Sequence, residues 1–141
     1  MLVLDTSVLL AALDADERRH GGCRALLDDC DEVLVIPSPV LPELGYWAEQ
    51  RLGVDAMITV LGDVRRGAYI VEEPSLDDLV RVQALLDTYR DLHVGFVDAS
   101  VLAIVERLGE PKLATLDRRH FGAMRPRHVD ALELVPPEFP A

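Results

Sequence analysis

Cysteine is scarce in this sequence, and no cysteines and histidines have the spacing of a structural zinc site. The two cysteines, Cys23 and Cys30, lie in one predicted helix, where a rise of about 1.5 Å per residue separates their Cα atoms by roughly 10 Å. Because that distance exceeds the reach of a disulfide, we expect two free thiols. A chain of 141 residues can bury a core without such crosslinks, and we predict one domain spanning residues 1–141.

Long apolar runs are also missing. None approaches the roughly 18 residues that cross a membrane. The start, MLVLD, lacks the basic region and apolar stretch of a signal peptide. We therefore expect an unprocessed cytoplasmic protein without a membrane partner.

Basic residues are few, and the net charge of −11 argues against a protein that coats nucleic acid with its whole surface. The segment from residue 112 to residue 128 is the exception. It carries one acid and five basic residues: Lys112, Arg118, Arg119, Arg125 and Arg127. Arginine suits bidentate phosphate contacts, although an Arg-rich codon bias would produce the same composition.

Short apolar strands alternate with helices along the chain. We predict strands at residues 1–4, 33–36, 68–71, 113–115 and 132–135, and helices at 8–13, 16–29, 39–52, 54–66, 76–90 and 97–108. Residues 117–121 are expected to form a turn, and Pro136, Pro137 and Pro140 an irregular tail. The pattern predicts an α/β domain whose mainly parallel sheet has helices on both faces. In such sheets, ligands bind at the carboxyl ends of the strands.

Two aspartates follow predicted strands. Asp5 comes directly after the first strand, and Asp117 comes two residues after the strand at 113–115. Taken singly, Asp5 is typical of a helix N-cap and Asp117 of a cap or turn residue. Their shared position at carboxyl ends of strands also suits a ligand site.

Two further acids interrupt apolar helix faces. Asp98 precedes apolar residues at i+3, i+4 and i+7, and Glu43 is followed at i+3 and i+4 by Tyr46 and Trp47. A charge on a buried face must be paired, hydrogen-bonded or bound to a metal. The alternatives are that Asp98 complements the helix dipole and that Glu43 reaches solvent at the rim.

Clustered carboxylates repel one another unless a cation lies among them. Oxygen ligands favour a hard ion, Mg²⁺ or Mn²⁺, and such an ion can activate water for attack on a phosphodiester. Three nearby basic residues are candidates for holding substrate phosphates: Lys112, Arg118 and Arg119. The pattern therefore indicates metal-dependent phosphodiester hydrolysis.

Four motifs resemble those of PIN-domain ribonucleases, and specifically the VapC-type toxins of bacterial type II toxin–antitoxin pairs. The motifs are LVLDTSVLLAAL around Asp5, PVLPELGYWAEQRLG around Glu43, GFVDASVLAIVERLG around Asp98 and LATLDRRHF around Asp117. They occur in family order and at family spacing over most of the chain. The resemblance implies a three-layer α/β/α sandwich in which these four acids form a catalytic, metal-binding cluster.

Further expectations follow from the resemblance. The metal, Mg²⁺ or Mn²⁺, would be touched most directly by Asp5 and Asp98, with Glu43 and Asp117 acting directly or through water. Ser7 and Thr115 match hydroxyl positions that bond the carboxylates. The family implies hydrolysis of RNA to 5′-phosphate and 3′-hydroxyl ends, a homodimer, and an inhibiting antitoxin.

Several alternatives stay open at this point. Tyr46 and Trp47 either line an antitoxin groove or are core aromatics. A surface histidine is a better interpretation of His120 than a general base. A receiver-like phosphoacceptor domain needs a lysine just beyond a late strand. It is disfavoured because the only lysine, Lys112, precedes its strand, and Asp117 follows that strand instead. A metal- or RNA-binding module without hydrolysis, or a PIN nuclease acting on DNA, would use the same acids.

Overall fold

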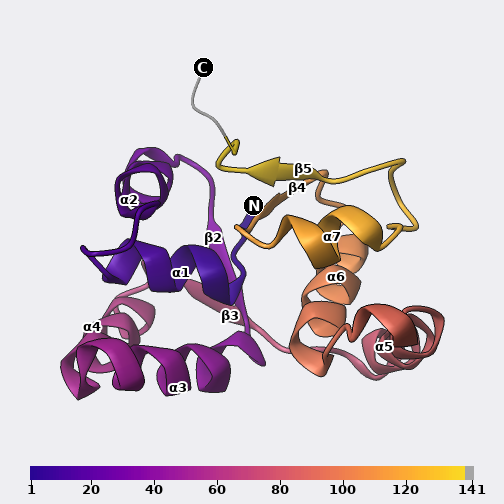
Figure 1. Cartoon of the computed structure of the whole chain (residues 1–141), viewed down its shortest axis with the longest axis horizontal. Helices are drawn as coiled ribbons and strands as arrows, with labels where there is room; N and C mark the ends of the chain where they lie inside the picture. The colour runs from indigo at the N-terminus through magenta and orange to yellow at the C-terminus, as the bar shows by residue number, and fades with distance from the viewer. Residues whose placement is uncertain (139–141) are drawn as a thin grey trace.

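Five parallel strands form the centre of the protein. The computed structural model describes residues 1–138, with strands β1 (Leu2–Val3), β2 (Leu34–Pro37), β3 (Ile70–Glu72), β4 (Lys112–Ala114) and β5 (Glu133–Val135). Strands β1, β2 and β3 pair in that order, and β4 pairs with β5. A parallel bridge between Leu4 and Ala114 joins the two sheets, so the spatial order is β3-β2-β1-β4-β5 (Figure 1).

The helices lie on both sides of these strands. They are α1 (Thr6–Leu13), α2 (His20–Asp29), α3 (Val40–Leu52), α4 (Val54–Arg65), α5 (Leu76–Thr88), α6 (Phe96–Leu108) and α7 (Arg118–Ala123), with the 3₁₀ turn η1 (Arg90–Leu92). Helices α1–α4 pack on one side and α5–α7 on the other (Figure 1). Right-handed crossovers explain this division, because the chain moves from β1 toward β3 and then back across the sheet to β4 and β5. The predicted three-layer α/β/α sandwich is confirmed.

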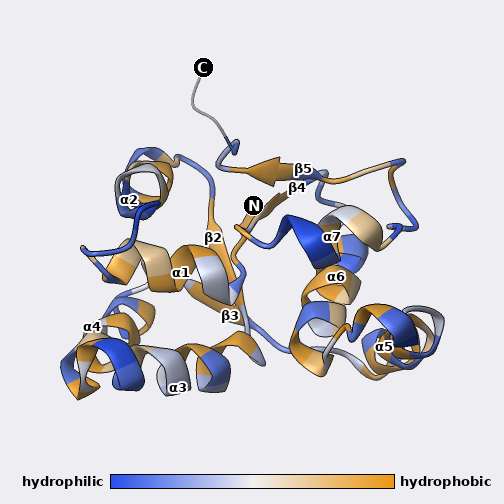
Figure 2. Ribbon diagram, viewed as in Figure 1, coloured by the Kyte–Doolittle hydropathy of each residue, from blue (hydrophilic) through white to orange (hydrophobic). Residues whose placement is uncertain are grey.

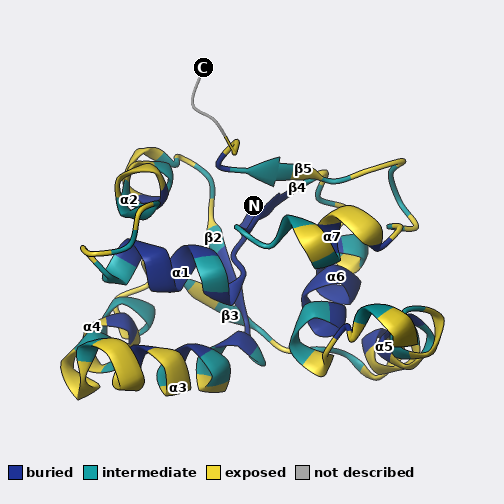
Figure 3. Cartoon of the chain, viewed as in Figure 1, coloured by how far each residue is buried: buried dark blue, intermediate teal, exposed yellow. Residues whose placement is uncertain are grey.

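The core lies along β1, β4 and helix α6. Helix α6 is buried without interruption from Ala99 to Val105, which agrees with its apolar composition (Figures 2 and 3). A helix that is apolar all round must be covered on every side; α5 packs against α6 on one side and the sheet lies on the other. The solvent-facing sides of α3, α4 and α5 are exposed (Figure 3).

The largest differences from the sequence prediction lie in two segments. Helix α2 begins at His20 rather than at residue 16, because the Asp14 side chain accepts a hydrogen bond from the Asp16 amide and favours a turn there. The turn expected at residues 117–121 is instead the start of α7, because Asp117 caps that helix. Pro140, predicted to lie in an irregular tail, falls outside the described residues.

The predicted free thiols are confirmed, since neither Cys23 nor Cys30 forms a disulfide. Across residues 1–138, no helix combines the length and the apolar character needed to traverse a lipid bilayer.

Candidate functional site

The acids meet where the strand order reverses. Asp5 follows β1 and Asp117 follows β4, and these neighbouring strands lie at the point where connections diverge to opposite faces of the sheet. Such switch points open a crevice at the carboxyl ends of parallel strands. Asp98 reaches the same crevice from the first turn of α6, and Glu43 from the first turn of α3.

Asp5 is the most buried acid, with 3% of its surface exposed. It occupies the N-cap position of α1, yet its side chain caps no backbone amide, so the capping interpretation is wrong. Its Oδ2 instead accepts hydrogen bonds from Thr115 Oγ1 at 2.7 Å and Ser7 Oγ at 3.0 Å. Its Oδ1 is buried and has no hydrogen-bond partner among residues 1–138. A buried, unpartnered carboxylate oxygen is costly unless a ligand satisfies it.

The two hydroxyls also hold the chain beyond β4. Ser7 Oγ accepts a hydrogen bond from the Leu116 amide at 2.9 Å, and Thr115 Oγ1 accepts one from the Asp117 amide at 3.0 Å. The segment that carries Asp117 is therefore fastened to the segment that carries Asp5.

A second cluster joins Asp98, Asp117 and His120. The His120 Nδ1 atom lies 2.9 Å from Asp117 Oδ2 and 3.1 Å from Asp98 Oδ2. Asp117 Oδ1 accepts a hydrogen bond from the His120 amide at 3.0 Å, so one carboxylate caps α7 and also faces the site. The capping role considered for Asp117 and its place among the acids are both observed.

This cluster has to hold a proton. His120 Nε2 lies 3.0 Å from the Leu92 carbonyl oxygen, which can only accept, so Nε2 carries hydrogen. Nδ1 then faces two carboxylates that also accept when ionised. The contacts between Nδ1 and these carboxylates are favourable when a proton lies between the atoms, either on Nδ1 or on a carboxylate.

The pKa values of the buried groups reflect this crowding. Burial and the negative charges of Asp5 and Asp117 raise the pKa of Asp98 to about 7. Burial also raises the pKa of Asp5, against the lowering effect of its bonds to Thr115 and Ser7. Burial lowers the pKa of His120, but its hydrogen bond to Asp117 and the neighbouring carboxylates outweigh that effect and raise it.

All four predicted acids line one cavity of about 200 Å³. Its lining consists of Asp5, Thr6, Ser7, Leu10, Glu43, Trp47, Arg51, Asp98 and Asp117. The Glu43 carboxylate makes no hydrogen bond or ion pair with residues 1–138, so it is free to act in the cavity. Trp47 and Arg51 complete the wall on the α3 side.

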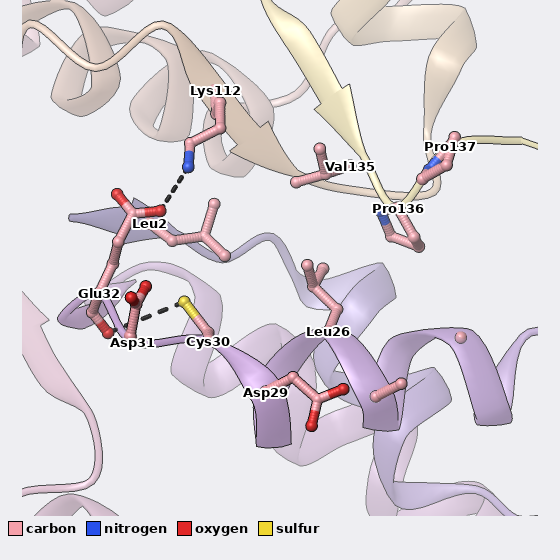
Figure 4. A pocket seen from close by; sticks show the side chains of 12 residues that line it. Leu2, Leu26, Asp29, Cys30, Asp31, Glu32, Lys112, Val135, Pro136 and Pro137 are labelled. Carbon is pink, nitrogen blue, oxygen red and sulfur yellow. Dashed lines mark hydrogen bonds and ion pairs between the residues drawn. The ribbon is translucent and has the colours of Figure 1, made fainter. Parts of the chain in front are cut away.

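The predicted phosphate-binding residues are not gathered at this cavity. Lys112 is the first residue of β4 and forms an ion pair with Glu32 at the opposite, amino ends of the strands, in a separate pocket shown in Figure 4. The Arg118 Nη2 atom donates to the carbonyl oxygens of Leu134 and Pro136, at 3.4 and 3.0 Å. Arg119 is exposed on α7. Strand direction places Lys112 away from the acids, because a residue at the start of β4 cannot reach its end.

The structure also corrects two expectations about aromatic and histidine side chains. His120 is not a surface histidine, because 21% of its side chain is exposed and both ring nitrogens are engaged. Tyr46 and Trp47 are not core aromatics, since both are exposed. The i+3 spacing from Asp117 to His120 is the signal that could have linked the histidine to the site.

The residues present fit a metal ion. Asp98, Asp117 and His120 each offer a ligand atom, and these atoms lie within 4.8 Å of one another. Asp5 adds the unpartnered Oδ1. A hard divalent cation would satisfy that oxygen and neutralise the carboxylate repulsion that, after burial, raises the pKa of Asp98.

Comparison with known proteins agrees with this geometry. A family model described as PIN domain matches residues 2–125. The chain belongs to the PIN-domain family. This PIN domain is 34% identical over 135 residues to Ribonuclease VapC26 of Mycobacterium tuberculosis, an alignment that covers 96% of this chain and 100% of that protein. The expected kinship with VapC-type PIN domains is confirmed.

Solved structures show the same fold. VapC20 of Mycobacterium tuberculosis, described as a sarcin–ricin loop cleaving toxin, superposes with a TM-score of 0.79 at 22% identity, over 87% of this chain and 95% of that one. VapBC2 of Rickettsia felis, bound to a promoter DNA fragment, matches at 0.64 and 18% identity, over 94% and 96%. FitAcB of Neisseria gonorrhoeae matches at 0.62 and 17%, over 95% and 96%.

Proposed function

We propose that this PIN domain, acting as one domain, is a Mg²⁺- or Mn²⁺-dependent endoribonuclease. The observation that carries the proposal is the convergence of Asp5, Glu43, Asp98 and Asp117 on one cavity in which Asp5 Oδ1 has no partner among the described residues. Four carboxylates without a cation repel one another, and this repulsion adds to burial in raising the pKa of Asp98. The name of the relative at 34% identity, Ribonuclease VapC26, supports RNA as the substrate.

The chain's own residues suit an in-line hydrolysis. Asp5, Asp98 and Asp117 would hold the ion, and His120 keeps the last two carboxylates close together. When bound, the ion supplies positive charge that activates water and stabilises charge on the phosphate. Glu43 is available to take the proton of the attacking water. The water oxygen bonds to phosphorus as the bond to the 3′ oxygen breaks, which leaves a 5′-phosphate and, after protonation, a 3′-hydroxyl.

With this activity the protein would act as a toxin, and a cognate antitoxin protein would inhibit it. Support comes from the names of VapC20, a toxin, and of the VapBC2 and FitAcB assemblies. The chain also has an exposed apolar surface on α4, formed by Val54, Ile58 and Leu61 at positions i, i+4 and i+7. A contiguous apolar stripe of this kind is typical of a protein interface.

A homodimer is proposed on a second apolar surface. Leu76, Leu79 and Val80 are exposed along α5, and Leu79 lines a depression together with the exposed Phe96. Burial of these side chains between two copies would remove them from water. The expected result is a dimer by light scattering, which an acidic substitution such as Val80→Glu converts to a monomer.

Cleavage by the purified, antitoxin-free protein tests the function. Total bacterial RNA is incubated with Mg²⁺ or Mn²⁺, beside an EDTA control, an Asp98→Asn variant and a single-stranded DNA of matched length. We expect discrete RNA fragments with 5′-phosphate ends, and we expect them to be absent in EDTA and with the Asp98→Asn variant. Cleavage of DNA alone would replace the ribonuclease by a DNA nuclease. Metal binding without cleavage of RNA or DNA would indicate a binding module that does not hydrolyse nucleic acid.

A further inference from the structure

Helix α3 presents one residue per turn to the acid cavity. Glu43, Trp47 and Arg51 are spaced at i, i+4 and i+8, and all three line the cavity. Residues four apart lie above one another on a helix, and two such steps span about 12 Å along its axis. The stripe therefore leads from the predicted catalytic carboxylate out to the solvent-facing end of α3.

Arg51 is the basic residue of this cavity. The lining contains four carboxylates and, among the described residues, the guanidinium of Arg51 alone as a positive charge. Arg51 forms no ion pair with a carboxylate anywhere in residues 1–138, whereas five of the other twelve arginines do. An exposed guanidinium without a carboxylate partner is free to bind an incoming anion.

Trp47 offers an aromatic surface beside that charge. Its side chain is 44% exposed, although tryptophan side chains are usually buried. Tyr46 packs edge-on against the indole, with ring centroids 5.1 Å apart and planes at 81°. The Arg51 guanidinium carbon lies 5.9 Å from the indole centroid. These two contacts orient the ring at the wall of the cavity.

We propose that Trp47 and Arg51 form a nucleotide-binding subsite in which an unpaired base stacks on the indole and Arg51 binds an adjacent phosphate. Aromatic stacking is the usual way in which proteins hold unpaired bases, and arginine binds phosphate in a bidentate manner. A phosphate chain entering a cavity of four acids needs such a cation. The subsite rests on the proposed function and makes an unpaired nucleotide beside the cleaved bond the preferred substrate.

A nucleic acid fits this position better than a protein segment does. The indole and guanidinium lie on the cavity wall with Asp5 and Asp98, where the scissile phosphate has to bind. The apolar side chains suited to a protein partner lie instead on α4, at Val54, Ile58 and Leu61.

Tryptophan fluorescence tests the subsite directly, because Trp47 is the single tryptophan of the chain. The probe is a single-stranded RNA of about 12 nucleotides, within the usual site size of such interfaces. It is titrated in Mg²⁺ into the Asp98→Asn protein, which prevents its cleavage, beside an abasic RNA of the same length. We expect base-bearing RNA to quench the emission and to bind about tenfold more tightly than the abasic RNA.

Variants separate stacking from charge. With a labelled RNA, Trp47→Leu should weaken binding of the base-bearing RNA about tenfold and leave the abasic RNA unaffected, and Trp47→Phe should restore most of the loss. Arg51→Gln should weaken both RNAs and reduce the slope of log K against log salt by about 0.7, the value of one phosphate contact on a single strand. Arg65→Gln, an exposed charge on α4 outside the cavity, is the matched control and should change neither.

Equal quenching by both RNAs, or a salt slope for Arg51→Gln equal to that of Arg65→Gln, would overturn the subsite. RNA binding with unchanged tryptophan emission would overturn the subsite and indicate that Trp47 and Arg51 contact a protein partner instead. Because these measurements need no turnover, failure of the subsite is distinct from failure of the ribonuclease: cleavage without base-dependent quenching rejects the subsite alone, and base-dependent quenching without cleavage rejects the enzyme alone.

Discussion

The hydroxyl of Thr115 donates a 2.7 Å hydrogen bond to Oδ2 of Asp5, a residue 110 positions earlier in the chain. The Thr115 hydroxyl oxygen also accepts a hydrogen bond from the Asp117 amide. One hydroxyl thereby couples the ends of β1 and β4 and keeps two acids in the cavity. Because Oδ2 is engaged in this way, Oδ1 of Asp5 is the atom left for a ligand.

Replacement of Thr115 by valine should reduce cleavage by about tenfold or more. The change leaves the Asp117 amide without its acceptor and removes a donor from Asp5, at a cost of about 1–3 kcal/mol in unfolding free energy. Thr115→Ser should recover most of the activity. Thr59→Val is the matched control, since its hydroxyl bonds only the Asp55 carbonyl on the exposed side of α4. Activity and urea unfolding are measured together; equal effects at residues 59 and 115 would contradict the coupling.

Substitution of Asp98 by asparagine should stabilise the metal-free protein while abolishing its response to Mg²⁺. At pH 8 the Asp98 carboxyl is ionised and is repelled by Asp5 and Asp117. Removing its charge should raise Tm in EDTA by ~4 °C. In wild type, Mg²⁺ should raise Tm by binding only the folded state. Asp130→Asn, at an exposed site, should do neither; a wild type insensitive to Mg²⁺ and Mn²⁺ would contradict the metal site.

Stability of the metal-free protein should fall as the pH rises from about 4 to about 7.5. The folded state keeps a proton on Asp98 up to a pKa of about 7, whereas the unfolded chain releases it near the ordinary aspartate pKa of 3.8. Folding therefore binds a proton in this window, and unfolding becomes easier as that proton is lost. The raised pKa of His120 acts in the same direction, since its contribution is lost as the pH rises through it.

The difference between wild type and Asp98→Asn isolates this effect from the titration of other groups. Urea unfolding in EDTA at pH 5 and pH 8 should show wild type losing roughly 2–3 kcal/mol more unfolding free energy than the variant. Parallel profiles for the two proteins would show that Asp98 titrates normally in the folded state.

The two arginines at the start of α7 should behave differently. Arg118→Gln loses the hydrogen bonds to the carbonyl oxygens of Leu134 and Pro136, and we expect it to lower the unfolding free energy by about 1 kcal/mol. Arg119→Gln, at an exposed side chain, should leave Tm unchanged and weaken RNA binding modestly. Thermal unfolding and RNA affinity measured on both variants test this, and a larger Tm loss at Arg119 would reverse the assignment.

Much of the architecture could be predicted from local patterns. The four acids could be predicted because two of them follow apolar strands and two interrupt apolar helix faces, and both features are visible in the local sequence. Their convergence on one cavity follows from strand direction, since carboxyl ends of parallel strands share an edge. The place of His120 could not be predicted this way, because it depends on Asp117 starting a helix rather than a turn.

The basic residues show the opposite outcome. Lys112 stands five positions from Asp117, yet the strand between them carries the two side chains to opposite ends of the sheet. Arg51 lies far in sequence from Asp5, Asp98 and Asp117 but lines the cavity with them, because α3 runs beside the site. Proximity along the chain is a poor guide to charge complementarity when an extended strand intervenes.

The sequence alone determined the α/β class, the parallel sheet and the four acids, because apolar periodicity and strand-end position are local properties. The family followed from the resemblance of four short motifs. Only the tertiary structure decided which oxygen of Asp5 stays unpartnered, that His120 joins Asp98 to Asp117, and that Trp47 and Arg51 stand at the cavity. These features depend on contacts between segments that are distant in the chain. Packing of the two helical layers against the sheet brings those segments together, and no local pattern encodes the distances that result.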